Sequence, residues 1–498
     1  MTVTEPPKSP LARMLRPVRL DAPTATSFAR GGLYSTVGLV AQGILRFATS
    51  FLVGHIAGKT VLGVVATAIA TSLTLALLWP TTTGSAASKF LARARGEQSP
   101  ERAHAAAAHL RMRTLQTGIL LGAVSVPIWV LIDAGSWVDA LCVAALTITY
   151  SGYSFTRGIQ FGAGQVPRAT MWDVTSVVLG LAGLVVLLLA GVRNTALVLP
   201  LVATYGLYTL ASWPYAGRGK PERPLRRELD AFVALGAIGS LASTGFLQLS
   251  QVAAKLTAGD TDAGQYASAI ALATPASLLA ASLTLVLLPS MSEAVGRKDL
   301  SAFRARTDNT TRALAVMLVA VFGAIMVCSR LIVGIVWGAK FAGAEKLLPV
   351  LAAAVLATNL CVASVNALNS RSQRGMVINT FAGITGMLVG AMIWVLVAPH
   401  LGLAGVALGY LCGTVVIASV PITVVWRQDG HRWGLVYGKV LVGVLIAGAL
   451  VVAEHAWDLP LALDLGFAVA FLAVWWALNR AEVARLPIPR PWRRGRRS

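Results

Sequence analysis

A stripe of polar residues runs along the first apolar segment of the chain. Its members, Ser35, Gln42, Arg46 and Thr49, are spaced seven, four and three residues apart, so on a helix they share one face. A charge as deep in a membrane helix as Arg46 costs at least about 2.5–3.5 kcal/mol if it faces lipid. We therefore expect Arg46 to face a water-filled cavity or a partner. The alternatives are that it bonds helix carbonyl groups or reaches outward past Thr49.

A second stripe of the same kind lies in the apolar segment at 229–254. Its polar side chains recur at steps of four, four, three and four residues, and the last is a lysine near the end of the segment. The stripe consists of Ser240, Thr244, Gln248, Gln251 and Lys255. Two helices that each carry a polar face and a cation predict one shared, hydrated cavity. Lys255 could alternatively be an anchor at the membrane surface.

Carboxylates are scarce where these cations lie. No Asp or Glu lies deep in the first six apolar segments, and Asp173 lies near one end of its segment, where Arg157 or Arg168 could neutralise it. A cavity marked by Arg46, Arg157 and Lys255 prefers an anion such as a phosphate or a pyrophosphate. Asp173 is the candidate for a coupling-ion site. The candidate substrate-binding residues are Gln42, Arg46, Thr49, Arg157, Gln248, Gln251 and Lys255.

The composition excludes a soluble globular protein. Apolar residues make up 56% of the 498 residues, and the mean hydropathy is +0.70. The net charge of +21 lies in loops between apolar runs, where it sets orientation, so it does not predict nucleic-acid binding. The 4 cysteines fall inside apolar runs without paired or metal-like spacing, and we expect neither disulfides nor a metal site. The charged residues 1–30 predict no cleavable signal peptide.

Apolar runs of roughly twenty residues predict about fourteen membrane-spanning helices. The predicted fold is an all-α polytopic membrane protein with two pseudo-symmetric six-helix bundles and a C-terminal helix pair. The predicted spans are 32–54, 62–84, 112–133, 137–159, 171–191, 195–213, 229–254, 265–288, 312–336, 346–369, 376–397, 403–425, 438–453 and 462–478. The predicted parts are a cytoplasmic tail (1–30), an N-terminal bundle (31–216), a cytoplasmic linker (217–228), a C-terminal bundle (229–426), the extra pair (427–478) and a basic cytoplasmic tail (479–498).

One stretch of the chain, 58–70, has a second copy at 259–271. The matching positions include Gly58, Thr60 and Gly63 in the first copy and Gly259, Thr261 and Gly264 in the second. Both copies lie between one apolar span and the next. We interpret them as the outer turn of two halves that repeat in the same orientation, the alternative being coincidence in an alanine-rich sequence.

Basic residues gather in alternate loops. They include Arg13, Arg93, Arg102, Arg226, Arg304 and Arg493, whereas loops of the opposite parity hold single cations or acids such as Lys59 and Asp133. Cytoplasmic loops of membrane proteins carry the excess of Lys and Arg, so both termini are predicted to be cytoplasmic. The Arg-, Ala- and Gly-rich composition indicates a bacterial plasma membrane.

Several segments resemble a known family. The segments at 248–255, 264–267 and 287–293 resemble the seventh and eighth helices of the polysaccharide transporter, or oligosaccharide flippase, family. This family belongs to the multidrug/oligosaccharidyl-lipid/polysaccharide (MOP) flippase superfamily. Gly402-Leu-Ala-Gly405 is similar to a later glycine-rich helix start of these proteins. Many relatives place an Asp where this chain has Gln251, and the segment 61–66 lacks the acidic, aromatic pattern of lipid II flippases.

The resemblance implies a flippase rather than an enzyme, without a cofactor. Its substrate would be an oligosaccharide on undecaprenyl pyrophosphate, moved from the inner to the outer leaflet by alternating access. The implied partners are this lipid-linked anion, membrane lipid, and a glycan polymerase or glycosyltransferases. The alternatives are a cation-coupled multidrug exporter, a lipid II flippase-like cell-wall protein, a membrane glycosyltransferase or glycan ligase, and a scaffold without transport activity.

Overall fold

The computed structural model describes residues 18–20, 28–133, 136–278, 280–281, 291, 299–457 and 460–483. Within these residues every regular element is a helix, and 13 helical stretches are long and apolar enough to cross a membrane. The prediction of an all-α polytopic protein is therefore confirmed. The seventh predicted span and the start of the eighth form one stretch, Arg223–Ala273, and much of the eighth lies outside the described residues.

In the first half of the chain, the described structure has nine helical elements between Phe28 and Ser212, and the sequence indicates one of the breaks between them. The predicted second span divides at Trp79 and Pro80, where one helix ends and another begins. Proline lacks the amide hydrogen that would continue the helix and is favoured at the first helical positions. The elements are α2 (Phe28–Leu52), the π-helix η1 (Val53–Ala57), α3 (Lys59–Leu77), α4 (Pro80–Gly96), α5 (Pro100–Asp133), α6 (Trp137–Gly162), α7 (Val166–Leu189), η2 (Thr195–Val198) and α8 (Leu199–Ser212).

The second half begins with α9, which starts inside the segment predicted as a linker. Its elements are α9 (Arg223–Ser240), the π-helix η3 (Leu241–Gly245), α10 (Phe246–Ala273), α12 (Leu300–Val327), α13 (Ser329–Val336), η4 (Ala339–Phe341), α14 (Ala344–Leu360), α15 (Val362–Arg371), α16 (Gln373–Leu401) and α17 (Leu403–Asp429). The extra pair is α18 (Gly434–Ala456) and α19 (Ala462–Val483).

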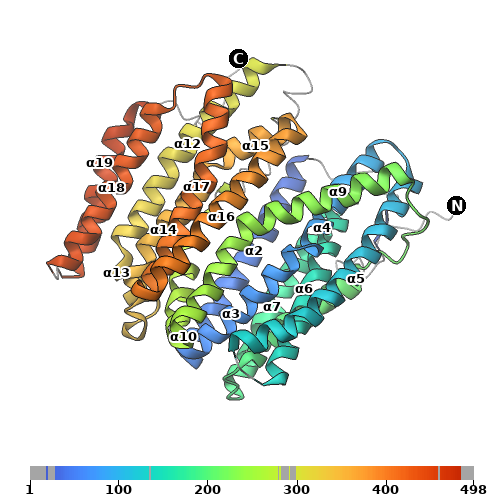
Figure 1. The fold of residues 1–498 in the computed structure, drawn as a ribbon, viewed down its shortest axis with the longest axis horizontal. Coiled ribbons are helices and arrows are strands. Elements are labelled where there is room, and N and C mark those ends of the chain that lie inside the picture. Colours follow the sequence, from blue (N-terminus) through green and yellow to red (C-terminus); the bar gives the residue numbers. More distant parts are fainter. Residues whose placement is uncertain are drawn as a thin grey trace, which may run out of the picture.

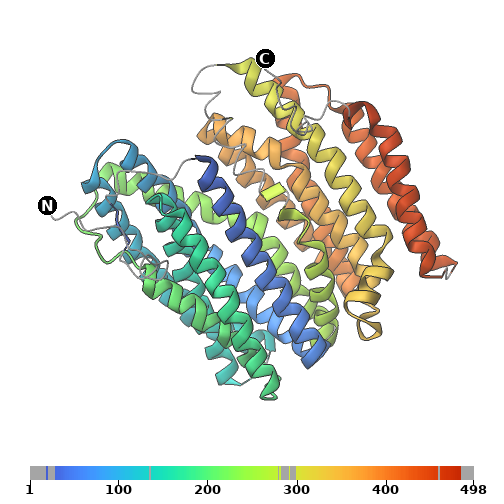
Figure 2. The same ribbon diagram turned by 180° about the vertical axis from the view of Figure 1, so that it is seen from behind.

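The two halves lie side by side, and the extra pair lies at the far edge of the second half (Figure 1). The opposite view in Figure 2 shows the same order, with α18 and α19 farthest from the first half. The pair packs on α12, where Trp475 Nε1 donates to the Val316 carbonyl at 2.9 Å. Between the halves, α3 and α10 are in direct contact.

The two ends of the helices differ in chemistry. We call one end the basic end, because Arg93, Arg102 and Arg226 lie there, where α4 meets α5 and α9 begins. The other is the turn end, which contains Gly58 and Gly259.

Ion pairs at the basic end attach α9 to the first half. Arg93 Nη1 lies 3.1 Å from Glu228 Oε1, and His109 Nε2 lies 2.9 Å from Asp230 Oδ1. The π-helix η3 then separates α9 from α10, which contacts α14 and α17 of the second half. The seventh predicted span is thus two helices with different neighbours.

Glycines allow α4 and α6 to approach closely. A Cβ atom at Gly158 would lie 2.0 Å from the Gly84 carbonyl oxygen, so a side chain there forces the backbones apart. We expect Gly158→Ala to lower the free energy of unfolding by about 1–3 kcal/mol, as overpacking does. Thermal unfolding of the purified protein in detergent measures the effect. Gly448→Ala is the matched control, since a Cβ there meets nothing within 4 Å, and an equal loss in both variants would contradict this explanation.

Candidate functional site

Two cavities meet at Arg46 on α2. The first, which we call the central cavity, has a volume of about 240 Å³ and lies among α2, α3, α8 and α10. The second, the N-half cavity, has a volume of about 380 Å³ and lies among α2, α4 and α6. The polar residues of the central cavity include Arg46, Thr49, Ser50, Gln248 and Gln251. Those of the N-half cavity include Gln42, Arg46, Thr81, Ser88, Tyr150, Ser154 and Arg157.

Arg46 is the residue that both cavities share. Its side chain is exposed, and its Nη2 atom lies 3.5 Å from the Tyr150 hydroxyl, to which it donates. No carboxylate is among the described residues that line either cavity. The arginine therefore presents a positive charge to both spaces, and a guanidinium donates in the forked geometry that suits phosphate oxygens.

The polar stripes predicted from the sequence reach these cavities. Thr49, Gln248 and Gln251 line the central cavity, and Gln42 lines the N-half cavity. Gln251 Nε2 donates to the Ala263 carbonyl at 3.1 Å and to the Thr67 hydroxyl of α3 at 3.4 Å, so this amide connects the two halves. The Tyr205 hydroxyl donates to Gln42 Oε1 at 3.4 Å.

Arg157 lines the N-half cavity, but its charge is balanced. Its Nε atom lies 3.0 Å from Asp173 Oδ2, and the Tyr153 hydroxyl donates to Asp173 Oδ1 at 2.9 Å. Asp173 is fully buried. Gly38 on α2 makes room for this pair, because a Cβ there would lie 2.6 Å from Asp173 Oδ2. Of the two arginines that line the cavities, Arg157 is paired with a carboxylate and Arg46 is not.

A cluster of four tyrosines, three of which line the cavities, was not predicted. The Tyr153 ring lies 4.6 Å from that of Tyr205 and 4.9 Å from that of Tyr208, and the Tyr150 ring lies 5.5 Å from that of Tyr205. Edge-to-face and tilted ring pairs of this kind stabilise a packed wall. The available signal was the spacing of three residues within each helix, which places Tyr150 with Tyr153 and Tyr205 with Tyr208 on one face.

Lys255 is not brought to either cavity. It is buried near the turn end, where its Nζ atom pairs with Asp133 of α5 and lies 2.6 Å from Asp260 Oδ1. The same ammonium lies 5.2 Å from the centre of the Trp129 ring. The expectation that Lys255 adds positive charge to the cavity is thus corrected, because two carboxylates surround it.

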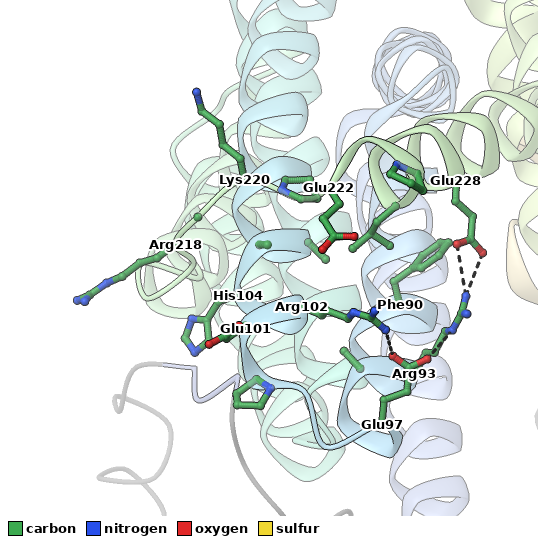
Figure 3. A pocket seen from close by; sticks show the side chains of 18 of the residues that line it. Phe90, Arg93, Glu97, Glu101, Arg102, His104, Arg218, Lys220, Glu222 and Glu228 are labelled. Atoms are coloured by element: carbon green, nitrogen blue, oxygen red, sulfur yellow. Dashed lines mark hydrogen bonds and ion pairs between the residues drawn. The ribbon is translucent and has the colours of Figure 1, made fainter.

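A larger pocket lies at the basic end, outside the helix core. It has a volume of about 860 Å³ and lies between the α4–α5 connection and the segment before α9. Figure 3 shows Arg93 between Glu97 and Glu228, while Arg218 and Lys220 point away from the pocket. Hydrogen bonds from Arg102 and Arg93 hold the pKa of the Glu97 carboxyl below its ordinary value. These exposed ion pairs connect surface segments, so we do not assign the candidate site to this pocket.

The fold is similar to that of solved membrane transporters. An inward-facing multidrug resistance MATE family transporter of the MOP superfamily aligns with a TM-score of 0.63 and 16% identity, over 83% of this chain and 98% of that chain. A MOP superfamily transporter from Pyrococcus furiosus, described as having a binding pocket of reverse polarity, aligns with a TM-score of 0.60 and 16% identity. The alignment covers 81% of this chain and 95% of that chain. An outward-facing multidrug resistance MATE family transporter aligns with a TM-score of 0.59 and 14% identity, over 81% of this chain and 95% of that chain.

A family model described as "Polysaccharide biosynthesis protein" matches residues 112–346. This match and the transporter fold agree. The chain has the fold of solved MOP-superfamily transporters. A search of curated proteins finds no match. The matched segment includes α6 and α10, which contribute Arg157, Gln248 and Gln251 to the two cavities.

Proposed function

We propose that this transporter moves an oligosaccharide linked to undecaprenyl pyrophosphate from the inner to the outer leaflet of a bacterial plasma membrane. The basic end would face the cytoplasm, with both termini on that side, in keeping with the positive-inside rule. The pyrophosphate would bind at Arg46, and the sugars would occupy the polar N-half cavity. The prenyl tail would remain in lipid between the halves.

The observation that carries the proposal is the unbalanced charge of Arg46. The cavities contain two arginines and no carboxylate among the described lining residues, and Asp173 neutralises one of the arginines. A cationic drug would meet a positive charge there, whereas a pyrophosphate would gain charge-assisted hydrogen bonds. The family model's description as a polysaccharide biosynthesis protein supports a glycan as the cargo.

The charge of the substrate also supplies a driving force. An inside-negative membrane potential favours outward movement of negative charge by about 2.3 kcal/mol per charge for each 100 mV. A pyrophosphate-linked glycan could therefore be exported without a coupled ion. Glycosyltransferases on the inner side would supply this substrate, and a polymerase on the outer side would consume it.

Proteoliposomes test the proposed function directly. An undecaprenyl-pyrophosphate-linked oligosaccharide is placed in the vesicle membrane, and an impermeant glycosidase measures the fraction exposed at each surface. We expect the purified protein to move this lipid across the bilayer, faster when a potential of the right sign is imposed. Uptake of tetraphenylphosphonium driven by a proton gradient, with no movement of the glycan lipid, would instead identify a drug exporter. Failure to move either compound would favour the scaffold hypothesis.

A further inference from the structure

The extra pair contains two carboxylates that are completely buried. Glu454 lies near the end of α18, and Asp464 lies in the first turn of α19. Both side chains are 0% exposed. In Figure 1 the end of α18 and the start of α19 lie at the same end of the molecule as α13. Acids within membrane-spanning helices are costly, so as a rule they have a partner or a ligand.

Both acids are held against the start of α13. Arg330 Nη1 donates to the Glu454 carbonyl oxygen at 3.0 Å, and Cys328 Sγ donates to the Asp464 carbonyl oxygen at 3.8 Å. Only Ser329, the first residue of α13, separates Cys328 from Arg330. One short stretch of the chain thus holds both acids. Their carboxylates interact electrostatically with each other and with the Arg330 guanidinium.

Several polar atoms gathered here have no partner. All four carboxylate oxygens of Glu454 and Asp464 are buried without a hydrogen bond among the described residues. The Ser329 hydroxyl and His455 Nε2 are buried and unpartnered as well, while His455 Nδ1 donates to a backbone carbonyl at 2.8 Å. Buried polar atoms without partners are rare and point to a bound water or ion. We call Ser329, Arg330, Glu454, His455 and Asp464 the acid cluster.

Elsewhere the chain neutralises buried carboxylates with its own arginines. Asp173 accepts from Arg157 at 3.0 Å, and Asp429 accepts from Arg371. Within the described residues, no hydrogen bond of this kind reaches the carboxylates of the extra pair. The acid cluster is thus an exception to the way in which this protein balances charge.

The charges of the acid cluster do not balance. Glu454 and Asp464 bring two negative charges, and Arg330 brings one positive charge close to both. At least one more positive charge is needed. Burying an uncompensated carboxylate costs several kcal/mol, which is enough to bind a cation from solution.

We propose that the acid cluster binds one monovalent cation, either Na⁺ or a proton, and that this cation attaches the extra pair to α13. Carboxylate and hydroxyl oxygens are hard ligands of the kind that Na⁺ prefers. A proton would instead be shared by the two carboxylates or carried by His455 Nε2. Arg330 opposes a divalent ion, because its positive charge lies close to both carboxylates. Cation binding at this place does not depend on the cargo proposed above.

Thermal unfolding of the purified full-length protein in detergent tests the site. If the cation is Na⁺, replacing choline chloride by NaCl at about pH 8 should raise Tm by about 3–5 °C, and each chain should retain a single radioactive sodium ion. If the cation is a proton, NaCl has no such effect. Tm is then higher at about pH 6 than at about pH 8, since a proton bound only by the folded protein stabilises it at low pH and is lost as the pH rises.

A charge-free variant assigns either effect to the acid cluster. Glu454→Gln/Asp464→Asn has no buried negative charge there, so it needs no cation and should lose the dependence on Na⁺ or on pH. Glu101→Gln is the matched control, because it removes an exposed carboxylate at the basic end and should behave like the unmodified chain. A dependence that persists unchanged in Glu454→Gln/Asp464→Asn would overturn the proposal.

A native cysteine reports the attachment of the extra pair without any change to the acid cluster. Cys328 is buried and contacts Asp464, and it becomes the single thiol when Cys142, Cys361 and Cys412 are replaced by alanine. We expect the bound cation to slow maleimide labelling of Cys328 by about tenfold, because labelling requires local opening. At each pH the rate is compared with that of Glu454→Gln/Asp464→Asn in the same background. If neither Na⁺ nor pH changes this ratio or Tm, the acid cluster is not a cation site.

Discussion

Arg46→Gln is expected to remove most of the movement of a pyrophosphate-linked glycan while leaving the protein folded. A hydrogen bond to a charged group contributes about 1.5–3 kcal/mol, so its loss weakens binding by roughly 10- to 100-fold. Stability should change little, because Arg46 is exposed in the cavities and its one hydrogen bond to Tyr150 is long, at 3.5 Å. Arg46→Lys keeps the charge but not the forked donor geometry, so we expect an intermediate rate.

Two measurements on the same protein preparations check this result. Initial rates of glycan-lipid movement in proteoliposomes give the transport defect, and binding of undecaprenyl pyrophosphate in detergent gives the loss of affinity. Arg102→Gln is the matched control, since that arginine is 59% exposed at the basic end and pairs with Glu97. If Arg46→Gln transports at the rate of Arg102→Gln, the pyrophosphate does not bind where we place it.

The layout of the fold could be predicted because the membrane constrains it. A helix must be about 20 apolar residues long to cross the hydrocarbon core, so apolar runs report spans directly. The repeat was visible because Gly58 and Gly259 occupy a backbone conformation that excludes other residues, and such positions keep their residue type and spacing. The division of the seventh span was not predictable in the same way. Its π-helix, Leu241–Gly245, lies in continuous helical sequence, and α9 packs on α4 and α5 of the first half as well as on α16 of the second.

For the candidate site, too, features set by local sequence could be predicted, and features set by residues distant in the sequence could not. Helical period alone placed Arg46 and Thr49 on the face that lines the central cavity. Period could not place Lys255, because its neutralising partner Asp133 lies 122 residues away in sequence. The sequence left open whether Arg157 or Arg168 pairs with Asp173. In the structure Arg157 Nε lies 3.0 Å from Asp173 Oδ2.

Asp173→Asn is expected to act in opposite directions on anion binding and on stability. Asp173 is fully buried and neutralises Arg157, whose side chain is 23% exposed at the N-half cavity. Removing the carboxylate charge leaves a second uncompensated cation beside the substrate path. An added charge at effective protein dielectric values favours an anion by about 1–2 kcal/mol, or roughly 5- to 30-fold in affinity. Binding of undecaprenyl pyrophosphate should therefore become tighter.

The same change should destabilise the folded protein. Breaking a buried ion pair costs up to about 3–5 kcal/mol, and partial access of Arg157 to the cavity lowers the expected cost to about 2–3 kcal/mol. Thermal unfolding in detergent measures this loss. In the double variant Arg157→Gln/Asp173→Asn no unpaired charge remains, so both the stability and the anion affinity should return toward those of the unmodified chain.

These opposite signs distinguish two roles for Asp173. An Asn side chain imitates a protonated carboxyl, so tighter anion binding in Asp173→Asn implies that a proton bound at Asp173 would strengthen substrate binding in the same way. Proton uptake would then be thermodynamically linked to substrate binding, since coupling between two sites is reciprocal. Weaker anion binding in Asp173→Asn would contradict the charge balance proposed for the cavity, and Asp173 would then act by holding Arg157 and Tyr153 in position.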